Sequence, residues 1–182
     1  TGTITDDQNG TYPVDDDAQT AILIGDAVSV EEANGNYLVY EVTLANAVAN
    51  DVSASIAPTG GTATSGDDYS ATLEYFDGTN WVALNATGDI TIKGDATEAV
   101  QVRVAVTDDA ITEGAETVVL GSSSTDTQVS DTTDTGTGTI TDDQNGTYPV
   151  DDDAQTAILI GDAVSVEEAN GNYLVYEVTL AN

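Results

Sequence analysis

The chain has 182 residues, of which 33 are Asp or Glu and only two are Lys or Arg, so its formal net charge at pH 7 is −31. This charge excludes nucleic acid and anionic membrane surfaces as natural partners, because both repel a polyanion. The absence of Cys and His excludes disulfides, thiolate metal sites and the commonest general base, and leaves oxygen ligands, which suit hard cations such as calcium.

The two ends of the chain carry the same sequence. Residues 1–46 recur without a change as residues 137–182, an offset of 136 residues. Self-similarity at a fixed period indicates tandem modules and favours a structural or adhesive array over an enzyme. We expect a closing strand at 1–7, a complete domain at 18–143 and the opening strands of a following repeat at 154–182. Residues 8–17 and 144–153 are the expected linkers.

Strand-like alternation dominates the complete repeat. Residues 37–44 (YLVYEVTL) place every second apolar side chain on one face, and residues 52–56 follow the same rule. Residues 100–106 alternate most cleanly, with Gln101 and Arg103 expected to face water. A disordered acidic chain is the alternative, but 40% of the residues are hydrophobic and they alternate. We therefore expect a folded protein whose charge is neutralised by cations.

Turn signals separate these runs. Asp77-Gly78 predicts a tight hairpin, after which Trp81 is expected to cover the edge of the core. Seven or more short strands at this spacing predict an all-β fold, an immunoglobulin-like antiparallel β-sandwich. No apolar run is long enough to predict a membrane-spanning segment, so membrane insertion is not expected.

Acidic residues concentrate where the expected strands end. The four clusters are Glu31-Glu32, Asp67-Asp68, the loop with Asp108, Asp109, Glu113 and Glu116, and Asp142-Asp143. Because the loops of a sandwich gather at two poles, clusters distant in sequence can meet, where each carboxylate would resist ionisation of the next. The competing interpretation is a set of solvated turns, which Asp favours for backbone reasons.

Three motifs carry a resemblance to a known family. TATSGDDY, TDDAITEGAE and GTITDD resemble the Calx-beta domain, which occurs in sodium–calcium exchangers and in large bacterial surface proteins. The resemblance implies an immunoglobulin-like sandwich that binds two or more Ca2+ ions at one end. The ligands that it implies are Glu32, Asp68, Asp108, Asp109, Glu113, Glu116, Asp142 and Asp143, together with the Ile111 carbonyl. Gln144 and Ala110 replace acidic residues of the family pattern, which implies that one calcium position is weaker or missing.

The hairpin around YFDGTNWVALN is longer than in the exchanger type of the domain. Together with the identical copies and the scarcity of Lys, it resembles the repeats of giant RTX-type adhesins that Gram-negative bacteria export by type I secretion. This resemblance implies an extracellular extender at the bacterial cell surface, stiffened by calcium between neighbouring repeats, that spaces an adhesive tip from the cell. Two alternatives stay open: a carbohydrate- or surface-binding module that uses Tyr75, Phe76 and Trp81, and a calcium sensor that regulates a partner. An enzyme is not expected, because metal ligation accounts for the paired carboxylates. The end segments are expected either to pair with each other between molecules or to stay frayed.

Overall fold

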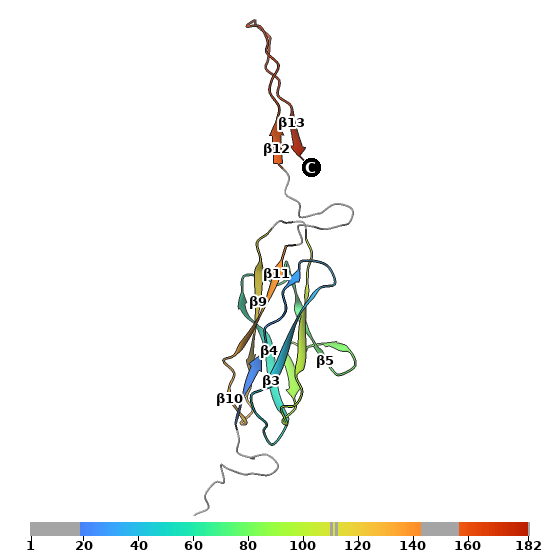
Figure 1. Ribbon diagram of the computed structural model, residues 1–182, viewed down its shortest axis with the longest axis vertical. Coiled ribbons are helices and arrows are strands. Elements are labelled where there is room, and N and C mark those ends of the chain that lie inside the picture. The colour runs from blue at the N-terminus through green and yellow to red at the C-terminus, as the bar shows by residue number, and fades with distance from the viewer. Residues whose placement is uncertain (1–18, 110, 112, 143–156, 182) are drawn as a thin grey trace, which may run out of the picture.

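The computed structural model describes residues 19–109, 111, 113–142 and 157–181. Residues 19–142 form a two-layer β-sandwich (Figure 1). One sheet has six strands in the order β10-β1-β3-β8-β5-β6, and the other has five in the order β2-β11-β9-β4-β7. The closing strand expected at 1–7, both expected linkers and Asp143 lie outside the described residues.

The strand bounds agree with the alternation of apolar residues. The six-stranded sheet consists of β1 (Thr20–Ile24), β3 (Tyr37–Leu44), β5 (Tyr69–Phe76), β6 (Trp81–Ala83), β8 (Val100–Val106) and β10 (Val129–Asp131). The five-stranded sheet consists of β2 (Val30–Glu31), β4 (Val52–Gly61), β7 (Asp89–Ile92), β9 (Glu116–Ser123) and β11 (Thr135–Thr141). The predicted all-β sandwich is therefore confirmed. Its sheets are mixed, however, because β1 pairs with β10 and β2 with β11 in parallel.

The core lies between the two sheets. In the pairing of β3 with β8, Leu38 lies opposite Val104 and Tyr40 opposite Val102, and all four side chains are fully buried. The Tyr40 hydroxyl donates a hydrogen bond of 2.9 Å to the Val118 carbonyl in the facing sheet. A Cβ atom at Gly138 would stand 2.5 Å from that hydroxyl, so this position of β11 has room only for glycine. The sheets are thus held closely together at β3 and β11.

The outer face of the six-stranded sheet differs from expectation. Arg103 does not face open water, since its side chain is only 17% exposed and its guanidinium is 2.7 Å from the Glu74 carboxylate. The guanidinium also lies 3.8 Å from the centre of the Tyr37 ring and 4.2 Å from that of Trp81. Trp81 therefore covers Arg103 rather than the edge of the core. Burial and cation–π attraction together hold β6 against the sheet.

The predicted hairpin at Asp77-Gly78 is confirmed. Phe76 pairs with Trp81 across the β5–β6 ladder, and the Asp77 amide donates to the Asn80 carbonyl to close the turn. Gly78 has φ of 94°, a conformation that favours glycine.

A separate two-stranded sheet contains the second copy of the opening sequence. Its strands are β12 (Ala157–Ile160) and β13 (Val178–Ala181), which pair in antiparallel register. No helix among the described residues is long and apolar enough to cross a bilayer.

Candidate metal centre

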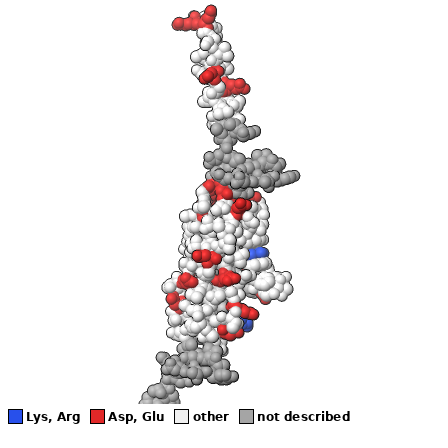
Figure 2. Space-filling model, viewed as in Figure 1, with Lys and Arg blue, Asp and Glu red and all other residues white. Residues whose placement is uncertain are grey.

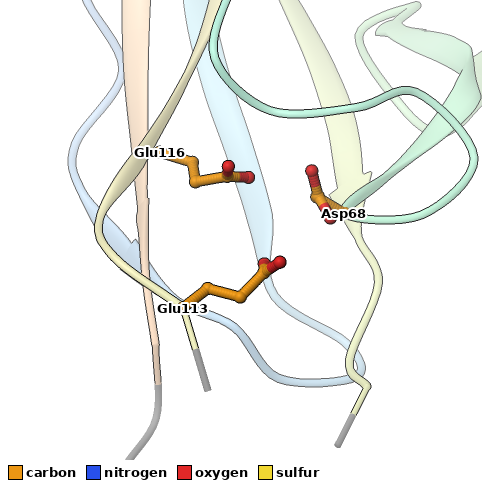
Figure 3. A group of neighbouring side chains, drawn as sticks. All are labelled: Asp68, Glu113 and Glu116. Carbon is orange, nitrogen blue, oxygen red and sulfur yellow. The ribbon is translucent and has the colours of Figure 1, made fainter. Parts of the chain in front are cut away.

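Three carboxylates from separate elements converge at one end of the sandwich. Asp68 immediately precedes β5, Glu113 lies in the loop between β8 and β9, and Glu116 is the first residue of β9. Each offers one carboxylate oxygen, and these oxygens all lie within 4.8 Å of one another. Figure 3 shows the three side chains pointing toward a common space.

Backbone hydrogen bonds fix the position of Asp68. Its own amide donates to the Thr64 carbonyl at 3.0 Å, and the Thr64 amide donates back to the Asp68 carboxylate. The Asp68 carbonyl accepts a further bond of 2.9 Å from the Thr107 amide, just after β8. The turn that carries Asp68 is thus tied to the end of β8, where the acidic loop begins.

Two further predicted ligands line the same hollow as these three carboxylates. A hollow of about 570 Å³ is lined by Asp68, Glu113 and Glu116, and also by Asp109 and Ile111. Asp109 accepts a hydrogen bond of 2.7 Å from the Ile111 amide, which stabilises the tight turn of the loop. Five of the nine predicted ligand residues therefore share one cavity.

Three other predicted ligands do not line the hollow, namely Asp142, Glu32 and Asp108. The Asp142 carboxylate accepts a bond of 2.9 Å from the Glu113 amide, so it adjoins the trio. Glu32 is buried, and its amide donates to the Thr141 carbonyl at the end of β11. The Asp108 carboxylate accepts a bond of 2.8 Å from the Asn34 side chain. The structure thus connects Asp108 to the β2–β3 turn, a contact that the sequence does not predict.

Asp67, which is not among the predicted ligands, also lies at this site. It lines the same hollow as Asp68 and Glu113. The acidic pair Asp67-Asp68 could have indicated it, but the resemblance to the family implies only Asp68 as a ligand. Asp67 also adds to the negative charge that acts on Glu113.

Electrostatic repulsion is concentrated at this cluster. Burial raises the pKa of Glu116 to about 7, and a hydrogen bond with Asp68 and the charges of Asp68 and Glu113 contribute to the shift. Burial also raises the pKa of Glu113, with added repulsion from Asp68, Asp109, Asp142 and Asp67. Without a counterion, the fold therefore opposes full ionisation of its own cluster.

The chain supplies no basic side chain to offset that repulsion. Its two cations are Lys93 and Arg103, and each is paired elsewhere, with Asp51 and Glu74 respectively, at 2.7 Å. In the face shown in Figure 2, acidic side chains are spread along the sandwich and basic area is small. The charge of the cluster can therefore be reduced only by protonation of its carboxylates or by cations from solution.

The donor set fits calcium. Calcium–oxygen bonds are about 2.3–2.6 Å long, so two ligands on opposite sides of one ion lie up to about 5 Å apart. The separation of at most 4.8 Å among the three carboxylate oxygens satisfies this limit. The ligand atoms are all oxygen, and the hollow leaves room for backbone carbonyls or water to complete the six to eight ligands that calcium prefers.

The three aromatic residues considered for sugar binding lie in different environments. Trp81 has the guanidinium of Arg103 on its ring and packs against Phe76 with 5.4 Å between ring centres. Tyr75 and Phe76 line a groove of about 640 Å³ between the β5–β6 hairpin and the connection to β8. Of the three aromatic residues considered for sugar binding, Trp81 is thus committed to intramolecular packing.

Three comparisons with known proteins were made for this chain, by solved structure, by curated sequence and by family model. A crystal structure of the apo form of the Calx CBD1 domain aligns with a TM-score of 0.49 and 18% identity, covering 69% of this chain and 98% of the other. The calcium-binding domain CBD12 of CALX1.1 aligns with a TM-score of 0.47 and 18% identity, covering 67% and 44%. No curated protein matches the chain. The sequence model of the Calx-beta domain matches residues 15–144. The chain therefore belongs to the Calx-beta domain family.

Proposed function

We propose that this chain is a calcium-binding structural module of an extracellular, repetitive bacterial adhesin, and that calcium makes the module rigid. The observation that carries the proposal is the convergence of Asp68, Glu113 and Glu116 in a chain with no spare cation. Membership of the Calx-beta domain family, which implies calcium binding, supports it. Two or more ions per repeat are proposed from the number of surrounding acids.

The physical role of the ion follows from the repulsion in the cluster. Calcium supplies positive charge between carboxylates that otherwise oppose one another's ionisation. The ligand-bearing segments come from the loops before β5 and β9 and from the end of β11. Residues from different strands are thereby held at one end of the sandwich. Binding to the folded state alone raises the free energy of unfolding, by about 2.7 kcal/mol per site when calcium is at 100 times its dissociation constant.

The adhesin role rests on the repeated sequence. Identical copies at an offset of 136 residues suit an extender that gains reach from number, whereas a sensor has no use for many equal sites. The cluster adjoins Asp142, directly after β11, where the chain leaves the sandwich toward the next copy. Calcium at this position would stiffen the junction between repeats as well as the module. Surface attachment, export by type I secretion and the spacing of a tip are parts of this same proposal.

The test is thermal unfolding with and without calcium. We expect EDTA to lower the melting temperature by about 10 °C or more relative to millimolar CaCl2, since about 3 kcal/mol or more is lost in a domain of this size. Glu116→Gln should abolish most of this difference, because it removes a ligand from the trio. Glu98→Gln, which removes the same charge from an exposed position away from the hollow, is the matched control. Equal melting temperatures in EDTA and calcium would refute the proposal.

A further inference from the structure

Two hollows adjoin at the open edge of the sandwich, where β6 and β7 are the last strands of their sheets. One is the groove of about 640 Å³ that Tyr75 and Phe76 line, which we call the aromatic groove. The other is a cavity of about 490 Å³, which we call the serine cavity. Because Tyr75 of β5 and Thr91 of β7 line both, the two hollows are neighbours, and together we call them the edge cleft.

The serine cavity presents many hydroxyl groups. Serine and threonine residues of β4, β7 and β9 and of the segment after β9 line it, namely Ser53, Ser55, Thr91, Ser123, Ser124 and Thr125. Ser55 donates a hydrogen bond of 2.8 Å to the Asp89 carboxylate, and Ser124 donates one of 2.7 Å to the Ser53 carbonyl. Since a hydroxyl both donates and accepts hydrogen bonds, this lining suits a ligand that is itself rich in hydroxyls.

The aromatic groove combines aromatic side chains with negative charge. Three exposed acids line it, namely Glu41, Asp77 and Glu98. The Asp77 carboxylate accepts hydrogen bonds of 2.8 and 2.7 Å from the amides of Thr79 and Asn80. These bonds lower the pKa of Asp77 and keep its carboxylate ionised.

The basic side chain that lines the same groove does not offset this charge. The Lys93 ammonium is 2.7 Å from the Asp51 carboxylate, so its charge is already matched. The groove is therefore negative, which disfavours an anionic ligand. An organic cation fits it, because carboxylates pair with positive charge and the face of an aromatic ring attracts it.

We propose that the edge cleft binds a glycan whose sugar units carry free amino groups. The amino groups pair with Glu41 and Glu98, a sugar ring packs against the aromatic residues, and the hydroxyls of further units bind in the serine cavity. A lysine-rich peptide has the same charge, but its long side chains lose rotamer entropy when they are fixed. A sugar carries its amino group on a rigid ring, which avoids that loss, and it also supplies the hydroxyls that a lysine side chain lacks.

The edge cleft is separate from the carboxylate cluster. Asp68 directly precedes β5 and Phe76 is the last residue of β5, so the two sites lie at opposite ends of a strand about 23 Å long. The residues that line the hollow at the cluster do not line the edge cleft. The glycan site thus goes beyond the proposed structural role, and it can be tested independently of the calcium site.

Calorimetric titration of the full chain with glucosamine oligomers tests the proposal. It is done in millimolar CaCl2 at about pH 6, where carboxylates are ionised and amines protonated. We expect the affinity to rise from the dimer to the hexamer as both parts of the cleft fill, and the N-acetylated hexamer to bind at least about tenfold more weakly. The double variant Glu41→Gln with Glu98→Gln should lower the affinity about fivefold or more, because two exposed ion pairs are lost. Phe76→Leu should lower it about threefold, because it removes the ring face.

A matched pair of substitutions separates the cleft from the overall charge of the chain. Glu168→Gln with Glu177→Gln removes the same net charge from exposed positions that do not line the cleft, and should leave the affinity unchanged. Circular dichroism of each variant checks that it is folded. Equal losses in the two double variants would show that the hexamer responds only to net charge and would overturn the proposal.

The remaining outcomes concern the ligand. A lysine hexamer that binds as tightly as the glucosamine hexamer would overturn the assignment to a glycan, and equal binding of the N-acetylated hexamer would overturn the role of the amino groups. Failure of the glucosamine hexamer to bind would overturn the proposal outright. It would leave the calcium dependence of the melting temperature, and with it the proposed function, unaffected.

Discussion

Residues 21–45 and 157–181 have the same sequence, but their strands differ in length and burial. In the sandwich the strand β3 extends over all of Tyr37–Leu44, whereas its copy β13 begins only at Val178, the equivalent of Val42. The missing part is the part that pairs with β8 in the sandwich. The pairing of the first and third strands, by contrast, is present in both copies. Local sequence thus specifies the hairpin, and the rest of the sandwich specifies how far its strand continues and which face it buries.

This difference in context should appear most strongly as a difference in stability. We expect Leu38→Ala to lower the free energy of unfolding by about 2–5 kcal/mol, because it removes a fully buried side chain. Leu174→Ala, the same change in the second copy, should stay within about 0.5 kcal/mol, because that residue is 55% exposed. Denaturant unfolding of the two variants measures both changes. Similar losses in the two variants would mean that the second hairpin is buried in solution.

The sequence predicted the elements that depend on local pattern. Alternation assigned the buried face of β3 and β8, and Asp77-Gly78 located the β5–β6 turn. The order of acidic motifs also placed Asp68, Glu113 and Glu116 in one group, and the structure brings their carboxylates together. In each case the information lies within a few residues or in a family pattern.

Contacts between residues distant in sequence could not be predicted in this way. Alternation gave Arg103 its outward direction correctly, but it could not show that Tyr37 and Trp81 would cover the side chain from two other strands. The same holds for Asp108, whose bond to Asn34 crosses from the acidic loop to the β2–β3 turn. Period-two patterns report which face a residue occupies, and the covering of that face is decided by strand order.

The pH dependence of stability should differ between the sandwich and the hairpin of residues 157–181, because Glu116 is present only in the sandwich. The pKa of Glu116 is raised by burial to about 7, above the ordinary value of 4.5, so the fold favours its protonated form. Its contribution to stability is therefore complete below pH 4.5 and is lost as the pH rises through 7. With calcium removed, we expect the free energy of unfolding of the sandwich to decrease by about 1–2 kcal/mol over this range, after allowance for solvent screening. The melting temperature should fall accordingly.

Calcium and one substitution provide the controls for that pH profile. Millimolar calcium should flatten the profile above pH 6, because the ion stabilises the ionised cluster. Glu116→Gln should flatten it without calcium, and Glu98→Gln should leave it unchanged, since Glu98 is exposed and does not line the hollow. A melting temperature that rises between pH 5 and 7 in EDTA would contradict the assignment of Glu116 as the strained carboxyl.

The smallest expected difference between the copies concerns a single hydroxyl. Tyr40 donates its buried hydroxyl to the Val118 carbonyl at 2.9 Å, whereas the equivalent Tyr176 is 55% exposed. Tyr40→Phe should therefore cost about 1 kcal/mol, the typical net value of a buried hydrogen bond, and Tyr176→Phe should cost nothing measurable, because water satisfies that hydroxyl in any state. Denaturant midpoints of the two variants measured in calcium make the comparison. If Tyr40→Phe did not change the stability, the packing of β3 against Gly138 would hold the sheets together without a net contribution from the hydrogen bond of the hydroxyl.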